Sequence, residues 1–349
     1  MTLTVLSVAY PLAPVGPDAV GGAEQVLSEL DRALVAAGHR SIVVAREDSS
    51  VAGTLVPVPA ERGVLDEAVK ARAQAQVRAA IGAALARWPV DLVHLHGVDF
   101  FAYLPPPGPP ALATLHLPPD WYPREALNPT RPDTFLHCVS RTQHAACRSP
   151  VLLAPIENGV AVERLAARHA RRGFALVLGR ICPEKGIHLA VEAAKAAEVP
   201  LLIAGEVFGY ETHRRYFDEE VAPRLDRLRR FVGPVGFTRK RRLLTAARCL
   251  LVPSLAPETS SLVAREALAC GTPVVALANG ALVETVDHGR TGFLADDIAG
   301  LAEGIRRAPG LDPEACRADA RERFSLTRTV ERYLAVYAAL ARGDSRGVA

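Results

Sequence analysis

The sequence of 349 residues has no apolar run long enough to cross a membrane, and its formal net charge is only +3. So small a charge gives no reason to expect a nucleic-acid partner. The basic residues are scattered except in RKRR, residues 239–242, which we interpret as a solvated helix face. The six cysteines lie far apart and form no C-x-x-C pair, which favours free core thiols in a reducing compartment and gives a metal site little support.

What the sequence does contain is typical of a globular α/β protein. Hydrophobic residues make up 49% and charged residues 23%, and the length is enough for two domains of ordinary size. The N-terminal MTLTVLSVAYPL is interpreted as a first strand rather than a signal peptide. Short apolar runs alternate with helical segments throughout, which predicts doubly wound parallel sheets. We expect a soluble cytoplasmic protein.

The stretch from residue 249 to 276, CLLVPSLAPETSSLVAREALACGTPVVA, carries the strongest functional pattern. It predicts a buried strand, a polar loop, a helix capped by Ser260 and stopped by Gly271, and a second buried strand. A helix N-terminus that follows a strand and loop presents free N–H groups to an anion. Glu258 in the loop and Glu266 about two turns into the helix would then lie on either side of that anion. A diphosphate flanked by hydroxyl groups would suit this arrangement.

A second strand–loop–helix junction, GRICPEKG at residues 179–186, places Arg180 and Lys185 five residues apart. Both cations can converge on one phosphate beside a helix N-terminus, although chance placement on a surface loop remains an alternative. The glycine pair Gly21 and Gly22 opens a helix in the same way and lets the backbone approach a ligand.

Histidines follow two strands of the N-terminal half. His94 and His96 stand two apart on the strand DLVHLHG and point to the same side, with His96 at the crevice and His94 buried. No third metal ligand is evident near them. His116 follows the strand 111–115 as a proton or hydrogen-bond partner, with a structural role as the alternative. Acceptor candidates are His96, Asp120, Trp121 and Tyr122.

PETSSLVAREALACGTPVVA resembles the donor-binding signature of glycosyltransferase family 4, which comprises retaining nucleotide-sugar transferases of GT-B architecture. The resemblance extends over nearly the whole chain. Many members have Pro-Phe-Gly after the first glutamate, where this chain has Thr259, Ser260 and Ser261. The loop remains small and polar, but the donor-sugar preference does not carry over.

The resemblance implies two Rossmann-like domains facing across a cleft: residues 1–165 for the acceptor, 166–325 for the nucleotide sugar, and a C-terminal helix with the tail, 326–349, crossing back to the first. It implies that Arg180 and Lys185 neutralise the leaving diphosphate, that His116 contacts the donor sugar, and that Glu258 and Glu266 hold sugar and ribose hydroxyls. The catalytic set is then His116, Glu258, Arg180 and Lys185. The predicted donor-binding residues are Gly21, Gly22, Arg180, Lys185, Pro234, Val235, Glu258, Ser260, Ser261, Leu262 and Glu266.

These expectations define a retaining hexosyltransferase that uses a nucleoside-diphosphate sugar, most simply a UDP-sugar, and no cofactor or metal. The acceptor is open among a lipid-linked sugar, a polysaccharide and a small metabolite, so peripheral membrane contact also stays open. Two alternatives remain: a nucleotide-sugar-binding protein without turnover, and a UDP-sugar epimerase on the same architecture.

Overall fold

The computed structural model describes residues 2–61, 63 and 65–344, and the chain divides into two compact units. Unit 1 comprises residues 1–157 and 330–349, and unit 2 comprises residues 158–329. The sequence placed the corresponding boundaries after residues 165 and 325. The first boundary lies earlier than expected because Val160, Val162 and Leu165 pack into the core of unit 2.

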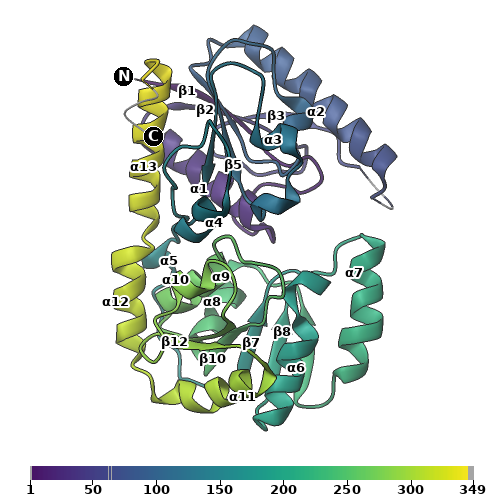
Figure 1. Ribbon diagram of the computed structural model, residues 1–349, viewed down its shortest axis with the longest axis vertical. Helices are drawn as coiled ribbons and strands as arrows, with labels where there is room; N and C mark the ends of the chain where they lie inside the picture. The colour runs from purple at the N-terminus through teal and green to yellow at the C-terminus, as the bar shows by residue number, and fades with distance from the viewer. Residues whose placement is uncertain (1, 62, 64, 345–349) are drawn as a thin grey trace. The chain divides into compact units, whose positions relative to one another are not determined.

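Unit 1 is built on a six-stranded sheet with the order β3-β2-β1-β4-β5-β6, and every recorded pairing between its strands is parallel (Figure 1). Its strands are β1 (Thr4–Val8), β2 (Arg40–Arg46), β3 (Thr54–Val58), β4 (Leu92–Leu95), β5 (Ala111–Leu115) and β6 (Thr134–Cys138). Its helices are α1 (Gly22–Ala36), α2 (Glu67–Arg87), η1 (Phe100–Tyr103), η2 (Pro119–Trp121), α3 (Arg124–Leu127) and α4 (Arg141–Ala146).

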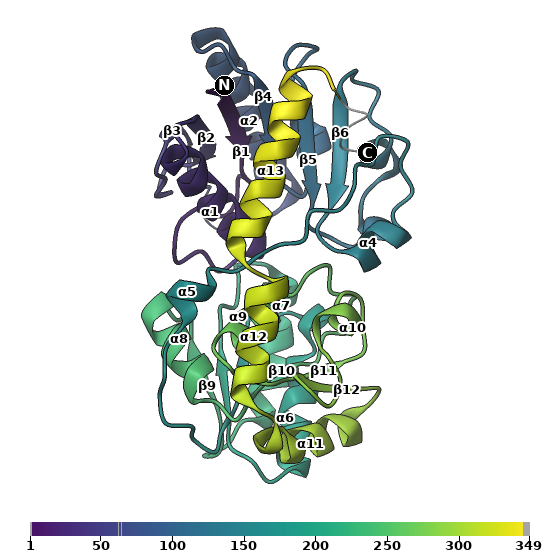
Figure 2. The ribbon, with the colours of Figure 1, turned by 90° about the vertical axis from the view of Figure 1, so that its left-hand side faces the viewer.

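Helices cover both faces of the unit 1 sheet. Val77 and Ile81 of α2 pack on one face with Leu6 of β1, whereas Leu27 of α1 packs on the other with Val43 of β2. The C-terminal helix α13 (Leu326–Ala341) belongs to unit 1 from residue 330 onward. It runs along the unit 1 sheet as the yellow helix in Figure 2.

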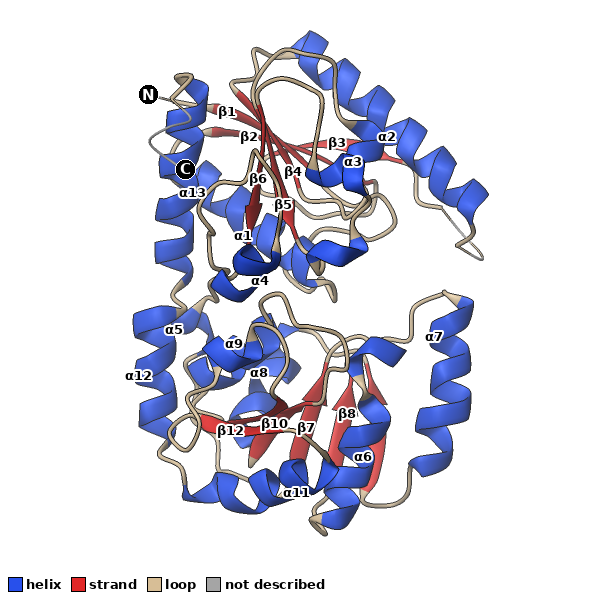
Figure 3. Cartoon of the chain, viewed as in Figure 1, coloured by secondary structure: helices blue, strands red, loops and turns tan. Residues whose placement is uncertain are grey.

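Unit 2 repeats the same design with the strand order β12-β11-β10-β7-β8-β9, again with parallel pairings (Figure 3). Its strands are β7 (Ala175–Leu178), β8 (Leu201–Ala204), β9 (Arg229–Gly233), β10 (Cys249–Val252), β11 (Val274–Leu277) and β12 (Gly292–Ala295). Its helices are α5 (Val162–Leu165), η3 (Pro183–Lys185), α6 (Ile187–Ala196), α7 (Glu211–Tyr216), η4 (Phe217–Val221), η5 (Ala222–Arg224), α8 (Phe237–Ala246), α9 (Leu262–Ala269), α10 (Leu282–Thr285), α11 (Ile298–Arg307), η6 (Ala308–Gly310) and α12 (Pro313–Arg323).

The unit 2 sheet is also covered on both faces. Ile187 of α6 and Ile305 of α11 pack into one core, and Leu268 of α9 and Cys316 of α12 pack into the other. In each unit the strand order reverses beside the first strand, at β1/β4 in unit 1 and at β7/β10 in unit 2. Ligands of doubly wound sheets bind at the carboxyl ends of the strands at this point. The predicted α/β class with two doubly wound sheets is confirmed.

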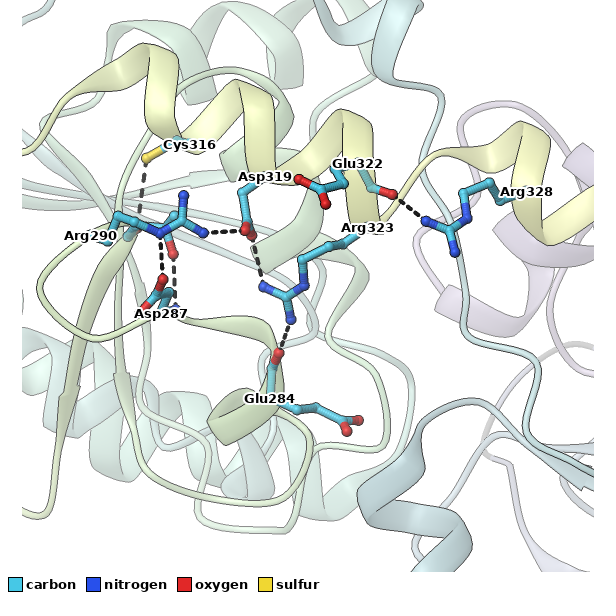
Figure 4. A network of polar contacts seen from close by, with 9 residues as sticks. Glu284, Asp287, Arg290, Cys316, Asp319, Glu322, Arg323 and Arg328 are labelled. Carbon is cyan, nitrogen blue, oxygen red and sulfur yellow. Dashed lines mark hydrogen bonds and ion pairs between the residues drawn. The ribbon is translucent and has the colours of Figure 1, made fainter.

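Helix α12 is fastened to unit 2 by a polar network (Figure 4). Asp319, whose side chain is 2% exposed, accepts hydrogen bonds from Arg290 at 2.6 Å and from Arg323 at 2.9 Å. Arg323 also donates to the backbone oxygen of Glu284. One buried carboxylate therefore joins the loop before β12 to α12, and α12 packs on α9, the helix of the strongest sequence pattern.

Two local predictions were wrong. Helix α9 begins at Leu262 with Ser261, not Ser260, at the N-cap, because Ser261 has left-handed backbone angles. Glu266 is therefore about one turn into the helix rather than two. The charged sequence after residue 211 also predicts a helix as far as Leu228, but the helical segment, made of α7, η4 and η5, ends at Arg224, because the following residues lead into the strand β9.

No helix among the described residues is long and apolar enough to span a bilayer. All six cysteines are buried and unbonded to one another, as expected for core thiols.

Candidate functional site

The switch point of unit 2 brings together two of the residues that the sequence singled out. Lys185 lies in the loop after β7 and Glu258 in the loop after β10, and their Nζ and Oε1 atoms are 2.5 Å apart. The Glu258 side chain is 8% exposed and also accepts a hydrogen bond from the hydroxyl of Ser254. The two loops thus share one buried, charge-assisted contact at the carboxyl edge of the sheet.

Backbone contacts hold the loop of Lys185 close to the loop of Glu258. Gly186 has φ +59°, and a Cβ there would lie 2.2 Å from the carbonyl oxygen of Pro253, so a larger residue would push the loops apart. The amide of Leu255 donates to the backbone oxygen of Glu184 at 2.8 Å. On the other side, the amide of Ala281 donates to the backbone oxygen of Glu258 at 2.7 Å. Glu258 is therefore held by three chain segments.

The electrostatics keep Glu258 ionised. Burial by itself would raise the pKa of this carboxyl, but the charge and hydrogen bond of Lys185, the Ser254 hydroxyl and the charge of Arg180 together lower its pKa below the usual value. Within the described residues, the guanidinium of Arg180 has no hydrogen-bond or ion-pair partner, although its charge acts on the Glu258 carboxyl. Arg180 is thus a cation at the same edge with its donors available to a ligand.

The N-terminus of α9 adds further unfilled polar groups. Ser260 is 4% exposed and Ser261 is 7% exposed, and neither hydroxyl has a partner among the described residues. Leu262 starts the helix beside them, so its free amide N–H groups face the same region. Buried hydroxyls without partners and a helix N-terminus provide hydrogen-bond donors for an anionic ligand.

Glu266 has a partner that sequence reasoning missed. Its Oε1 lies 2.6 Å from Nζ of Lys240, and the two side chains are 9% and 12% exposed. Lys240 belongs to RKRR, which was interpreted as a solvated face. The pair joins α8 to α9 across 26 positions of sequence, so nothing in the local pattern signalled it.

Pro234 and Val235 lie in the loop between β9 and α8, at the same carboxyl edge of the unit 2 sheet. Pro234 is exposed and Val235 is half-buried against the core. Nothing in their surroundings distinguishes them further.

In unit 1 the glycine pair begins α1 after the loop that follows β1. Gly21 is the N-cap, and a Cβ there would lie 1.8 Å from a carboxylate oxygen of Glu24, which is buried. That oxygen is the far end of a flexible side chain and Gly21 has φ −79°, so sterics alone do not require glycine here, and Gly22 is exposed. Both lie at the carboxyl edge of the unit 1 sheet beside its switch point.

His116 and His96 belong to a row of four histidines on or directly after strands β4 to β6, of which His116 is half-buried and the other three are buried. His96 Nδ1 is 3.3 Å from His116 Nε2, and its Nε2 is 3.1 Å from His94 Nδ1. His94 Nε2 contacts the Thr114 hydroxyl at 2.7 Å, which also contacts His137 Nε2 at 2.7 Å. His94 is buried as predicted, but His96 is buried too, at 1% exposure.

Burial lowers the pKa of all four of these histidines, and the neighbouring rings lower it further for His94, His96 and His116. The pKa falls well below its usual value for His94 and His96, to about 3 for His116 and to about 4 for His137. All four rings are therefore neutral at neutral pH, and His116 acts there as a hydrogen-bonding group.

The three remaining acceptor candidates have different surroundings. Asp120 and Trp121 are exposed, Trp121 at 47%. Tyr122 is buried, and its hydroxyl accepts hydrogen bonds from the amides of His116 at 2.9 Å and Leu117 at 3.2 Å. Tyr122 therefore shapes the backbone that presents His116.

Comparison with known proteins identifies the two units. Residues 20–155 match the family model described as Glycosyltransferase Family 4, and residues 173–308 match the model described as Glycosyl transferases group 1. The chain belongs to this glycosyltransferase family. The family 4 match covers unit 1 from α1 to the loop after α4 but not β1, and the group 1 match contains Arg180, Lys185, Glu258 and Glu266.

The chain is similar to several curated proteins over part of its length. It is 38% identical over 178 residues to a glycogen synthase of Mycobacterium tuberculosis, covering 48% of this chain and 42% of that protein. It is 32% identical over 219 residues to a D-inositol 3-phosphate glycosyltransferase of Saccharomonospora viridis, covering 54% of this chain and 50% of that protein. The chain thus matches half or less of the length of these relatives.

Solved structures match over nearly the whole family 4 chain. AviGT4, described as a glycosyltransferase involved in avilamycin A biosynthesis, has a TM-score of 0.74 at 25% identity and covers 98% of both chains. A sucrose-phosphate synthase of Thermosynechococcus elongatus has a TM-score of 0.78 at 21% identity, covering 97% of this chain and 100% of that one. The Anabaena protein HepE, in complex with UDP-glucose, has a TM-score of 0.74 at 19% identity, with the same coverage. The fold is GT-B, as predicted.

Proposed function

We propose that the protein is a glycosyltransferase that transfers a hexose from a nucleoside-diphosphate sugar to a hydroxyl acceptor, with retention of the anomeric configuration. The observation that carries the proposal is the junction of Lys185 and Glu258 at the switch point of unit 2, with the unpartnered guanidinium of Arg180 at the same edge. Cations beside unfilled N–H and hydroxyl donors form a site for a diphosphate.

The leaving group determines the chemistry that these residues supply. When the bond between the sugar and the diphosphate breaks, negative charge accumulates on the diphosphate. Arg180, Lys185 and the N–H groups at the start of α9 would stabilise that charge more strongly in the transition state than in the bound donor. We propose that these groups perform the task without a metal ion.

The two glutamates would orient the donor. Glu266, fixed by Lys240, is placed to accept hydrogen bonds from ribose hydroxyls, and Glu258, fixed by Lys185 and Ser254, to accept them from sugar hydroxyls. Pro234 and Val235, on the loop after β9, are the proposed base contacts. An ionised Glu258 is a strong acceptor, and the lowered pKa of its carboxyl keeps it in that form.

We assign the acceptor to unit 1, with His116 as a neutral hydrogen-bonding group and the exposed pair Asp120 and Trp121 as acceptor contacts. Gly21 and Gly22 would allow the backbone of the first loop to approach a donor phosphate. The acceptor class remains a lipid-linked sugar, a polysaccharide or a small metabolite. A cytoplasmic location also stays a prediction.

UDP is the first nucleotide to test, because the structurally similar HepE was solved in complex with UDP and with UDP-glucose. A thermal-shift screen in EDTA would compare UDP, GDP and ADP with their glucose, mannose and N-acetylglucosamine conjugates. A ligand at 100 times its Kd should stabilise the fold by about 2.7 kcal/mol. We expect UDP to stabilise the wild type and Arg180→Ala to abolish the effect.

Other outcomes separate the alternatives. Binding only after a divalent metal is added would overturn the metal-free proposal. Binding of a UDP-sugar with no transfer to any acceptor and no release of UDP would favour a binding protein, and conversion into an isomeric UDP-sugar would favour an epimerase. Unchanged turnover in His116→Ala would remove His116 from the catalytic set.

A further inference from the structure

A second cluster of reactive side chains lies in unit 2 beside the proposed donor site. Cys182 and Glu184 flank Pro183 in the short helix η3, and His213 comes from α7. A thiol sulfur, a carboxylate oxygen and a ring nitrogen of these three residues all lie within 4.8 Å of one another. Among the described residues this is the one group of three or more His, Cys, Asp or Glu side chains with such spacing.

The cluster is buried and contains polar atoms without partners. Cys182 is fully buried and His213 is 8% exposed. Among the described residues, neither Nδ1 of His213 nor Oε2 of Glu184 has a hydrogen-bond partner. A buried polar atom without a partner typically costs about 1–3 kcal/mol. The roles proposed for Arg180 and Lys185 do not explain why these atoms are left unfilled.

The sulfur already interacts within the cluster. The Cys182 thiol hydrogen-bonds the Glu184 carboxylate, and it also lies 3.9 Å from the backbone oxygen of Arg180, which is a long contact even for sulfur. The aromatic rings of Phe208 and Tyr210 lie beside the His213 ring, with centroids 6.4 Å and 5.1 Å away. These two aromatic rings form one side of the cluster.

We propose that Cys182, Glu184 and His213 bind a divalent transition-metal ion of the zinc class, with a fourth position left for water. A thiolate and an imidazole favour zinc over magnesium or calcium, which take oxygen ligands. Three protein ligands and one open position complete a tetrahedron. The thiol releases its proton to solvent on binding, and the thiolate and carboxylate then balance the two charges of the ion, so the neighbouring Arg180 does not oppose it.

The position of the ion defines what it would do. Helix η3 begins three residues after Arg180 and ends at Lys185, and the backbone oxygen of Glu184 accepts hydrogen bonds from the amides of Leu255 and Ala256 at 2.8 and 3.2 Å. These amides belong to the loop that carries Glu258. The ion would therefore tie α7 to the turn that carries both proposed phosphate-binding cations, which makes it a positioning ion rather than a participant in the reaction.

Cobalt(II) tests the site without any assay of activity. The full-length protein is treated with EDTA, desalted and titrated with CoCl2. We expect saturation at one equivalent, with the thiolate-to-cobalt charge-transfer absorption and the intense visible bands of tetrahedral cobalt, and displacement of the signal by ZnCl2. His213→Gln, Glu184→Gln and Cys182→Ser should each weaken binding by at least about 100-fold, beyond the usual loss on removing an outer-shell partner.

The matched control is Cys316→Ser, another buried thiol of unit 2 that should retain the full cobalt spectrum. Circular dichroism checks that each variant is folded, and if Cys182→Ser is not, His213→Gln and Glu184→Gln decide the result. Absence of saturable cobalt binding in the wild type, or an unchanged spectrum in these variants, would overturn the proposal.

The positioning role rests on the proposed function and needs a second measurement. We expect ZnCl2 to tighten UDP binding to the wild type by at least about threefold and to leave His213→Gln unchanged, whereas Arg180→Ala should lose UDP binding yet keep the cobalt spectrum. An equal zinc effect in His213→Gln would overturn the positioning role. Cobalt binding without UDP binding would overturn only the proposed function, and UDP binding without cobalt binding only the metal site.

Discussion

Ser261 shows at the scale of one residue how this chain departs from its family. Its φ of +55° is in the left-handed region, where a β-carbon is unfavourable by about 1–2 kcal/mol. Many family members have glycine at this position of the signature, which removes that strain. Serine adds a hydroxyl that glycine lacks. Ser261 is 7% exposed, and its hydroxyl has no partner among the described residues.

Ser261→Gly should raise the unfolding free energy by about 0.5–1 kcal/mol, since relief of backbone strain exceeds the extra entropy of an unfolded glycine. Urea denaturation measures the change. Ser261→Ala is the control, because it removes the hydroxyl and keeps the β-carbon. An equal gain in both variants would mean that the buried hydroxyl, not the backbone, is the source of instability.

Lys185→Met should lower the unfolding free energy at pH 7 by about 2 kcal/mol, less than the 3–5 kcal/mol typical of a fully buried pair because Lys185 is 30% exposed. The lowered pKa of Glu258 stabilises the fold above the usual carboxyl pKa of 4.5, and this contribution is lost as the pH falls through the folded value. The difference in unfolding free energy between the wild type and Lys185→Met should therefore become smaller in acid.

Chemical denaturation at pH 7 and pH 4 tests this expectation. Lys195→Met, at a surface pair whose side chains are 35% and 39% exposed, is the matched control and should change stability by less than about 0.5 kcal/mol. If the difference in unfolding free energy between the wild type and Lys185→Met did not depend on pH, the role of the Glu258 charge would be contradicted.

At the scale of elements, α13 is linked to the unit 1 sheet by a buried polar contact as well as by apolar packing. The Tyr337 hydroxyl is 2.6 Å from His94 Nδ1, and both side chains are fully buried. The Tyr333 hydroxyl lies 3.5 Å from that of Thr114, at the limit of a hydrogen bond. The C-terminal helix therefore joins the row of histidines at His94, between His96 and Thr114.

Tyr337→Phe should destabilise unit 1 by about 1 kcal/mol, because it removes the 2.6 Å contact of a buried ring nitrogen and leaves that nitrogen only the 3.1 Å contact to His96 Nε2. Tyr333→Phe is matched in chemistry and burial but loses only the long contact, so its cost should be below about 0.5 kcal/mol. Thermal and urea denaturation of the full chain compare the two. Equal losses would show that the His94 contact contributes nothing specific.

At the scale of the whole molecule, the two units share one topology but distribute their polar groups differently. Unit 1 holds four histidines whose pKa is lowered, three of them buried and His116 half-buried, while the site of unit 2 is built from ion pairs. A neutral buried histidine must gain a proton when the chain unfolds in acid. The unfolded state therefore binds more protons, and stability rises with pH between the folded and unfolded pKa values.

We expect the unfolding free energy to fall as the pH drops below about 6.5, the unfolded value, towards the folded values of about 4 for His137 and about 3 for His116. Each histidine contributes up to about 1.4 kcal/mol per pH unit to the slope of the unfolding free energy against pH. Denaturation between pH 7.5 and 4.5 measures the slope, which His137→Asn should reduce and the exposed His288→Gln should not. Equal slopes in all three proteins would contradict the account.

The sequence by itself determined the class of fold and most elements, because buried strands and helix caps leave local signals. The runs at 111–115 and 54–58 are strands over those residues, and Gly271, with φ +76°, follows the C-cap of α9. The pattern of Glu258 and Glu266 with Arg180 and Lys185 was visible because their spacing follows strand–loop–helix junctions.

Only the tertiary structure decided which of these groups touch. The pairs Lys185–Glu258 and Lys240–Glu266 join residues 73 and 26 positions apart, and the Cys182–Glu184–His213 cluster needs α7 folded against η3. The burial of His96 depends on neighbours from another strand. The left-handed φ of Ser261 depends on the path of the loop that precedes α9. Such contacts depend on the close packing of distant segments, and local periodicity carries no information about it.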